Sequence, residues 1–230
     1  MVKRLGRRVL LPVAFWLAVW ELCYRAVGQD LLLASPGQVV AYLAGGMNAT
    51  FWGCVDMSLV RTGAAYVLGV VLGVALAVLC HWAPLLGEVI RPALAVVRAT
   101  PVASFILALV WLSAGNVPIL AGLLMVVPVV YANVTQGIEA ADPQLLEMAR
   151  MFGWKRPKVW RRILLPTALP PFLAACEACV GMCFKATIAA EVIGVPRNAM
   201  GTQLYHAKIY LQTDALMAWT VVIILLICLI

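Results

Sequence analysis

The chain has 230 residues, of which 64% are hydrophobic and only 12% are charged, and its formal net charge is +7. Soluble domains are about 45–50% apolar and about 25% charged, so this composition excludes an ordinary soluble enzyme. It also excludes an intrinsically disordered chain, because disorder requires low hydrophobicity. Lys and Arg held on one membrane face explain the positive charge, and nucleic acid is not expected as a partner.

Six apolar segments indicate an all-α, polytopic membrane protein. Each is close to the ~20 residues that a helix needs to cross the hydrocarbon core, and backbone groups in lipid must be paired, so each segment is expected to be helical. The first is too long for the apolar region of a cleaved signal peptide and is expected to be retained. The third is expected to continue a helix that starts near Pro84. The expected spans are residues 9–27, 57–81, 100–112, 117–137, 166–190 and 214–230, within a single transmembrane domain over residues 1–230.

The distribution of Lys and Arg predicts a cytoplasmic N-terminus. The cytoplasmic segments are then residues 1–8, 82–99 and 138–165, and they hold twelve Lys and Arg side chains. Four others lie in outer segments or at outer span ends, namely Arg25, Arg61, Arg197 and Lys208. Cytoplasmic loops carry an excess of Lys and Arg, so the inverted topology is rejected.

Residues 138–166 are predicted to contain two short helices joined at a glycine. Asp142 can cap a helix that has Pro143 at its first position, and Gly153 suits the left-handed position that ends it. A second, basic helix is expected around residues 158–164, before the fifth span. This segment is too short and too polar to span the bilayer, so it is interpreted as a docking element for a cytoplasmic partner. The residues expected to make or position that contact are Leu145, Leu146, Glu147, Ala149, Arg150, Phe152 and Gly153.

Three ionisable residues, Glu177, Lys185 and Glu191, lie in or at the end of the fifth span. A charged group in the bilayer is costly, so each is expected to face a partner or a water-filled path. Two interpretations stay open: structural pairing, for example of Lys185 with a carboxylate, and lining of a translocation path. A cation at this depth would favour an anionic solute.

A row of small residues, Ala65, Gly69, Gly73 and Ala77, recurs every four positions in the second span. Such rows let helix backbones approach closely. Close packing within the subunit or across a dimer is therefore preferred over a solute path at this face.

The cysteines do not follow the pattern of a disulfide framework. There are seven, an odd number, and nearly all lie in apolar segments. Cys176, Cys179 and Cys183 share one helical face, which would suit a metal or redox site, but no histidine accompanies them. Cysteine is also a common small apolar residue in packed helices, and this interpretation is preferred.

The 138–166 segment resembles the EAA loop of the membrane subunits of binding-protein-dependent ABC importers. Glu147-Met148-Ala149, Gly153 and Ile163-Leu164-Leu165-Pro166 reproduce the spacing of that loop, with Met148 in place of an alanine. Further motifs resemble the nitrate/sulfonate/taurine-type group. They are Ser35-Pro36, Ser58-Leu59-x-Arg61 with Gly69 and Gly73, Arg98-Ala99-Thr100-Pro101, Trp111-Leu112-Ser113, Asp142-Pro143-x-Leu145-Leu146-Glu147, Leu165-Pro166-x-x-Leu169-Pro170 and Ala190-Glu191.

The resemblance implies the type I ABC importer permease fold, with about six transmembrane helices and a cytoplasmic coupling helix, in the inner membrane of a bacterium. It implies three kinds of partner: an ABC ATPase in two copies, a periplasmic or lipid-anchored substrate-binding protein, and a second copy of this chain. The chain itself is then not an enzyme and needs no cofactor or metal, because ATP and Mg²⁺ would bind the ATPase. This agrees with the absence of a G-x-x-x-x-G-K-[ST] motif and of zinc-ligand spacing from the sequence.

Several alternatives stay open. The solute implied by the resemblance is sulfonate-, nitrate- or taurine-like, or a vitamin precursor. An ATP-independent channel or secondary transporter would explain the spans but not residues 138–166, and an intramembrane thiol enzyme would use the cysteine face. Relatives in this group usually continue past the last span with a polar tail, whereas Ile230 has no basic residue after it, so a truncated and a short chain both fit.

Overall fold

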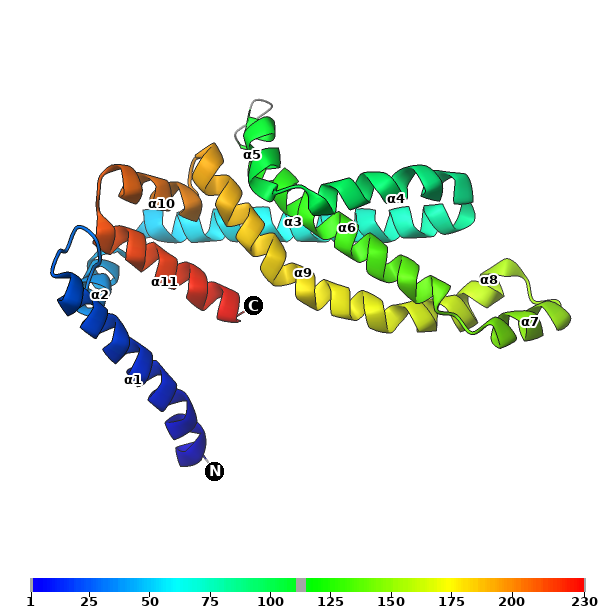
Figure 1. The fold of residues 1–230 in the computed structure, drawn as a ribbon, viewed down its shortest axis with the longest axis horizontal. Coiled ribbons are helices and arrows are strands. Elements are labelled where there is room, and N and C mark those ends of the chain that lie inside the picture. The colour runs from blue at the N-terminus through cyan, green and yellow to red at the C-terminus, as the bar shows by residue number, and fades with distance from the viewer. Residues whose placement is uncertain (1, 111–114, 230) are drawn as a thin grey trace.

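The computed structural model describes the backbone of residues 2–110 and 115–229 and the side chains of residues 11–109 and 115–229. Every regular element in these ranges is helical. The helices form an elongated bundle, with α7 and α8 at one end and α2 and α10 at the other (Figure 1). In chain order they are α1 Val2–Val27, α2 Pro36–Gly46, α3 Ala49–Trp82, α4 Pro84–Ala99, α5 Val102–Val110, α6 Val117–Glu139, α7 Pro143–Met151, α8 Arg156–Val159, α9 Leu165–Gly194, α10 Met200–Ile209 and α11 Thr213–Leu229, and a π-helical turn, Trp160–Leu164, joins α8 to α9.

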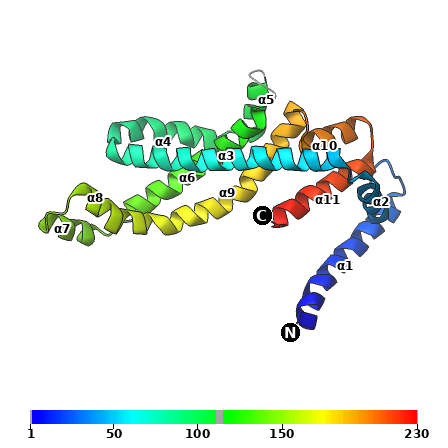
Figure 2. The same cartoon turned by 180° about the vertical axis from the view of Figure 1, so that it is seen from behind.

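The centre of the bundle is α6, which packs against both α3 and α9 (Figures 1 and 2). The small-residue row of α3 makes this possible. A Cβ on Gly69 would lie 2.7 Å from the Cβ of Val126, and one on Gly73 would lie 2.8 Å from the Cβ of Val130. The two alanines of the row are also buried. Of the two packing alternatives, the row thus serves helix contact within the subunit.

The helix before the third expected span does not continue into it. α4 ends at Ala99, and α5 starts at Val102 after a bend of 99°. Pro101 disfavours helical backbone at the residue before it, and Thr100 is extended, with φ −81° and ψ 134°. The prediction of one continuous helix from Pro84 is therefore wrong. The end of the expected 100–112 span and the Trp111-Leu112-Ser113 motif lie outside the described residues.

The basic helix expected at residues 158–164 is continuous with the fifth span. One helical run extends from Arg156 to Gly194. Pro166 has no N–H to donate, so an ordinary helical hydrogen bond is missing at this point. The backbone adapts with the π-helical turn, in which the N–H of Leu165 donates to the carbonyl of Trp160. Pro166 is therefore inside the run and does not mark the start of a separate span.

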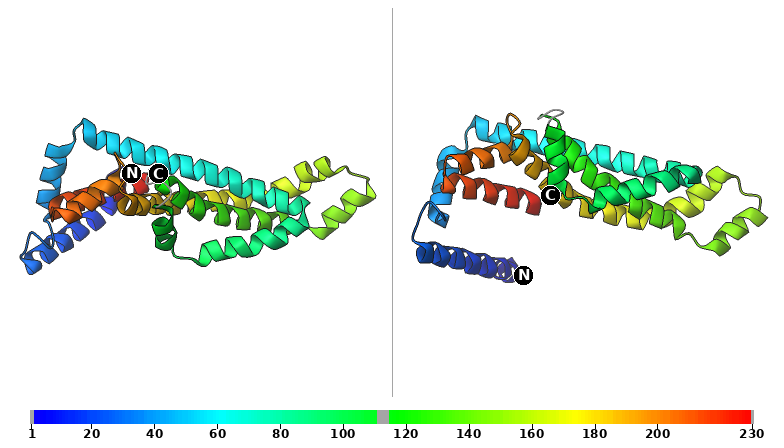
Figure 3. Two further views of the ribbon diagram at one scale, coloured as in Figure 1. Left: turned by 90° about the horizontal axis from the view of Figure 1, so that it is seen from above. Right: turned by 45° about the horizontal axis from the view of Figure 1, so that its top comes forward.

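The N-terminal helices are less closely attached to the bundle. α1 extends away from the other helices, whereas α2 packs against α11 (Figures 1 and 3). α2 begins with a reciprocal cap: the Oγ of Ser35 accepts from the N–H of Gln38, and the Oε1 of Gln38 accepts from the N–H of Ser35. The indole Nε1 of Trp20 donates to the carbonyl of Ala34 at 3.0 Å, which ties α1 to the start of α2.

The structure confirms a polytopic, all-helical membrane protein. Three runs in the described residues are long and apolar enough to span a membrane: α3, α6 and Arg156–Gly194. The bent pair of α4 and α5 makes a fourth if it forms one broken span. α11 is a shorter apolar helix, and part of the expected 9–27 span lies where side chains are not described. The count of six spans stays a prediction.

Candidate functional site

The segment that the sequence predicts to be a docking element, residues 138–166, contains the helix α7, which is capped at both ends. The Oδ1 of Asp142 accepts from the N–H of Gln144 at 2.8 Å. At the other end Gly153 has φ +63°, and its N–H donates to the carbonyl of Arg150 at 3.0 Å. The N–H of the next residue, Trp154, donates across it to the carbonyl of Ala149 at 2.9 Å. This pair of bonds is a Schellman motif, which fixes the direction in which the chain leaves α7.

The apolar side chains of α7 divide between two environments. Ala149 is 1% exposed, and Leu146 is half-buried against the main core. Leu145 and Phe152 point outward, and Phe152 is 74% exposed. A side chain that the sequence analysis did not select, Met151, is 88% exposed.

An exposed apolar patch at the tip of the bundle is typical of a protein–protein contact, and Met suits such surfaces because its side chain is flexible. Met151 could have been predicted to lie on this patch, because it is two residues from the buried Ala149 and two residues turn an α-helix by about 200°. Glu147 and Arg150 are exposed beside this patch and add one charge of each sign.

The return from α7 to the bundle is held by aromatic contacts. The Nζ of Lys158 lies 4.1 Å from the ring centroid of Trp154. The ring of Trp160 meets those of His81 and Trp82 edge to face, at 5.6 and 6.3 Å between centroids. The π-helical turn is therefore packed against the end of α3, so α7 projects from a fixed base (Figure 3).

A buried polar network lies at the opposite end of the bundle and includes Glu191. The carboxylate of Glu191 is fully buried and accepts from three groups: the Oγ of Ser58 at 2.7 Å, the N–H of Gly201 at 3.1 Å and the guanidinium of Arg61 at 3.3 Å. The Oγ of Ser58 in turn accepts from the N–H of Met200 at 3.0 Å. α3, α9 and the start of α10 therefore meet at one carboxylate.

The same network holds the loop between α9 and α10. The guanidinium of Arg61 donates to the carbonyls of Arg197 at 2.9 Å and Asn198 at 3.2 Å. Val195 and Asn198 have φ of +46° and +50°, a conformation unfavourable for side-chain-bearing residues. The sequence singled out Glu191 but assigned no role to Ser58 or Arg61, although both belong to the motif Ser58-Leu59-x-Arg61.

Glu177 and Lys185 have a different environment from Glu191. Both side chains are exposed on α9. No carboxylate among the described residues lies within ion-pair distance of Lys185. Between them, a Cβ on Gly181 would meet no atom within 4 Å. The structure therefore does not bring the three ionisable residues of α9 together: Glu191 is paired, while Glu177 and Lys185 lie on an uncovered surface.

The cysteine face of α9 contributes to the core. Cys179 and Cys183 are fully buried in the main core, and Cys176 is half-buried. The Sγ of Cys183 lies 3.7 Å from the carbonyl of Thr62 on α3. This placement agrees with the use of cysteine as a small residue in packed helices.

Comparisons with known proteins identify relatives along most of the chain. Residues 69–230 match the family model described as binding-protein-dependent transport system inner membrane component. The chain is 26% identical to the taurine transport system permease protein of Escherichia coli (strain K12), over 95% of this chain and 84% of that protein. It is 25% identical to a protein of Bacillus subtilis (strain 168) that is named putative aliphatic sulfonates transport permease protein. That match covers 96% of this chain and 81% of the relative.

A further relative and a solved structure extend this similarity. The formylaminopyrimidine transport permease protein of Halalkalibacterium halodurans is 24% identical over 81% of this chain and 77% of that protein. A chain in a crystal structure of an amino acid ABC transporter superposes with a TM-score of 0.65 at 20% identity, over 78% of this chain and 88% of that chain. At this identity the structural match supports the fold alone.

Proposed function

Because the chain belongs to the family of binding-protein-dependent transport system inner membrane components, we propose that two copies of it form the translocation path of an ATP-driven importer. The chain is a permease subunit of an ABC importer and a multi-pass membrane protein, and the ATPase activity resides in a separate subunit. The proposal adds the homodimer, two ATPase subunits, and delivery of solute by a periplasmic or lipid-anchored binding protein. ATP and Mg²⁺ act on the ATPase subunits.

The observation that carries the proposal is the exposed apolar patch on α7. Phe152 and Met151 are largely exposed at the tip of a capped helix, on a base fixed by aromatic packing. Free exposure of such side chains to water is unfavourable, so a protein groove is their expected environment. We propose that α7 inserts into the ATPase. When the ATPase pair closes on ATP, this closure moves α7, and the continuous helical run to Gly194 transmits the movement to the outer end of α9.

The uncovered surface of α9 supports the position of the path. Lys185 and Glu177 are ionisable groups exposed on a spanning helix, where contact with lipid would be costly. We propose that they face the water-filled path between two copies, where Lys185 attracts an anionic solute. Glu191 has its carboxylate engaged by Ser58, Arg61 and Gly201, so we propose that it positions the outer loop.

The proposed solute is a small sulfonate. The relatives named for taurine and for aliphatic sulfonates cover almost the whole chain, and their named solutes carry a sulfonate group. A cation exposed on the fifth span fits such an anion. A vitamin precursor is the alternative solute class, and the solute named for the Halalkalibacterium relative is formylaminopyrimidine.

The orientation proposed from the charge distribution places α7 in the cytoplasm. The test is labelling of single cysteines, in a background without the exposed native cysteines, by an impermeant thiol reagent on intact cells. Gly45→Cys, close to the outer end of α3, should be labelled, whereas Lys155→Cys, after α7, should be labelled only after permeabilisation. The reverse result would contradict the orientation.

The decisive experiment on function is co-purification with the ATPase. Phe152→Asp should release the ATPase, because it places a charge in the docking groove. Tyr210→Asp is the matched control, since Tyr210 is an aromatic residue that is 67% exposed and directly follows α10. α10 lies at the opposite end of the bundle from α7 (Figure 1). Equal ATPase retention by both variants would favour the ATP-independent channel or secondary transporter.

A further inference from the structure

The loop between α9 and α10, residues 195–199, leaves α9 through a residue type that rarely adopts the observed conformation. Val195 follows the end of α9 with φ +46° and ψ +52°, in the left-handed region, and its N–H donates to the carbonyl of Glu191 at 3.0 Å. Glycine or asparagine usually occupies such a position, because a longer side chain crowds the backbone there. A β-branched residue in this region is an outlier, so the conformation of Val195 is strained.

The next residue, Pro196, restricts the other conformations open to Val195. A proline disfavours right-handed helical backbone at the residue before it, so α9 does not simply continue by another turn. The unstrained alternative for Val195 is extended backbone with negative φ. That change would redirect the chain where it leaves α9 and carry the rest of the loop with it. The Val-Pro pair therefore gives this position two backbone states, the strained one that is observed and an extended one.

Contacts from other elements hold the strained state. The three successive carbonyls of residues 196–198 all accept hydrogen bonds, the first from the Oγ1 of Thr202 at 2.7 Å and the other two from the guanidinium of Arg61 at 2.9 and 3.2 Å. Extended backbone at Val195 would break these bonds. Strained residues persist only where their surroundings hold them, and they are common in segments that switch between two states.

The loop leads into the start of α10, which packs against the outer end of α3 (Figures 1 and 2). Ala199 and Met200 are fully buried, and the N–H of Met200 donates to the Oγ of Ser58 on α3 at 3.0 Å. One turn further on, the Nε2 of Gln203 donates to the Sγ of Cys54 on α3 at 3.6 Å, and Cys54 is 1% exposed. Movement of the loop would pull α10 from α3 and expose the Cys54 thiol.

We propose that Val195 is the hinge of an outer gate with two states. In the observed, closed state Val195 is left-handed and Arg61 holds the loop. In the open state Val195 is extended, the bonds from Arg61 to the loop are broken, and the start of α10 lies away from α3. The strain lowers the free-energy difference between the two states, so a modest movement of α9 shifts their populations. The place of this gate on a solute path rests on the proposed function, whereas the two backbone states rest on the loop itself.

A purely structural explanation of the strain predicts a different outcome. If the left-handed residue only ends α9, relief of its strain should stabilise the protein and leave solute transport unchanged. If Val195 is a hinge, the same relief should hold the gate closed and lower transport. One kind of substitution therefore separates the two explanations.

The test is a series of substitutions at Val195 that differ in the cost of left-handed backbone. This cost is similar for Ile and Val, smaller for Asn and smallest for Gly. The full chain in nanodiscs is treated with a charged thiol reagent, and labelling of the native Cys54 is followed by peptide mass spectrometry. Val195→Gly should slow this labelling about 5- to 30-fold, which corresponds to the ~1–2 kcal/mol of strain that it removes. Val195→Asn should give an intermediate rate, and Val195→Ile should match the wild type.

A second native cysteine provides an internal control. Cys183 is fully buried in the main core, twelve residues before Val195 on α9. Its labelling should be slow in all four proteins, so changes of equal size at Cys183 and Cys54 would report general loosening and contradict the hinge.

Solute uptake by the ATPase-bound complex in liposomes should fall in the same order as the labelling of Cys54. Labelling rates that are equal in all four proteins, or highest for Val195→Gly, would overturn the proposal. Ordered labelling rates with equal uptake would overturn the role of the loop as a gate. Labelling needs only the permease, so the hinge is tested even if ATP-driven uptake, and with it the proposed function, fails.

Discussion

Replacement of Gly153 by valine should detach α7 from its partner without unfolding the bundle. Gly153 has φ +63°, and a Cβ built on it meets no atom within 4 Å, so the cost of a side chain is entirely that of the backbone conformation. For a residue with a side chain this cost is about 1–2 kcal/mol. That shifts a local equilibrium by roughly 5- to 30-fold toward conformations without the Schellman bonds. In those conformations the direction of α7 relative to the bundle is no longer fixed.

Asparagine at the same position provides a matched control. Asn tolerates the left-handed conformation better than other side-chain-bearing residues, so Gly153→Asn should retain most of the wild-type behaviour. Because the space around the Cβ is open, the larger side chain adds no steric cost. The two variants therefore differ mainly in backbone preference.

The assays are co-purification of the ATPase and solute-stimulated ATP hydrolysis in liposomes. Gly153→Val should lower both, and Gly153→Asn should stay close to the wild type, while the thermal unfolding of all three proteins in detergent stays similar. If the valine and asparagine variants couple equally well, the backbone conformation at Gly153 does not set the position of α7, and the reasoning is refuted.

Three other predictions concern packing, the buried network and the path. Gly69→Ala should lower the free energy of unfolding by about 1–3 kcal/mol, because its Cβ would lie 2.7 Å from a valine. Gly181→Ala, in open space, should not lower it. Equal shifts of the two variants in thermal melts in detergent would contradict this prediction. Arg61→Met should lower the free energy of unfolding by about 3–5 kcal/mol, because it leaves a buried carboxylate unpaired. Glu191→Gln should lower it less, and the opposite order of the two variants in the same melts would refute the pairing. Lys185→Met should lower uptake of an anionic solute in liposomes while the ATPase remains bound, and normal uptake would remove Lys185 from the path.

The sequence was most informative where structure depends on neighbouring residues. The bounds of α7 followed from Asp142, Pro143 and Gly153, because capping and left-handed turns depend on the residues at those positions. The break at Thr100 was missed because apolar composition continues across it. The X-Pro signal was present, but hydrophobicity alone does not register the backbone restriction.

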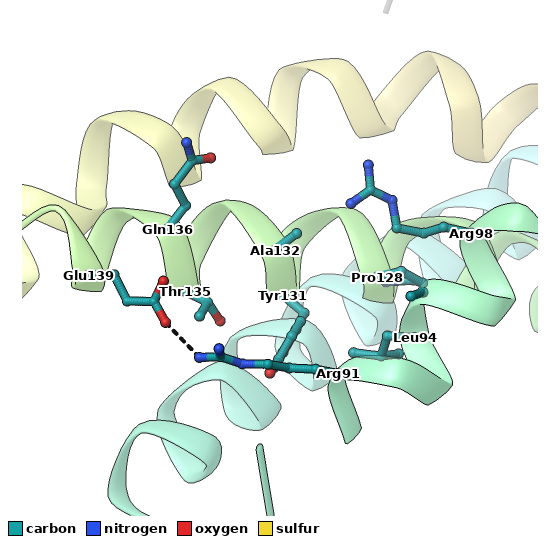
Figure 4. A pocket seen from close by; sticks show the side chains of 10 residues that line it. Arg91, Leu94, Arg98, Pro128, Tyr131, Ala132, Thr135, Gln136 and Glu139 are labelled. Atoms are coloured by element: carbon teal, nitrogen blue, oxygen red, sulfur yellow. Dashed lines mark hydrogen bonds and ion pairs between the residues drawn. The ribbon is translucent and has the colours of Figure 1, made fainter. Parts of the chain in front are cut away.

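Contacts between distant segments could not be predicted in the same way. Glu191 is 133 residues from Ser58 and 130 from Arg61, and nothing local to α9 indicates these partners. The sequence therefore left open whether Glu191 is paired or lines a path. A pocket that α4 and α6 line together was likewise not anticipated, because it depends on how α4 folds back beside α6 (Figure 4).

Under the proposed orientation, the continuous helical run from Arg156 to Gly194 would link the two faces of the membrane as a lever. At 1.5 Å per residue its 39 residues extend about 58 Å, so a tilt of about 5° around its middle would displace each end by about 2.5 Å. The contact with α6 would be the pivot of such a tilt, and the two ends would move in opposite directions. One end carries the base of α7, and the other carries the carboxylate that holds the outer loop. Under the proposed orientation, a movement of the cytoplasmic end would therefore reach the outer loop with similar size and opposite direction.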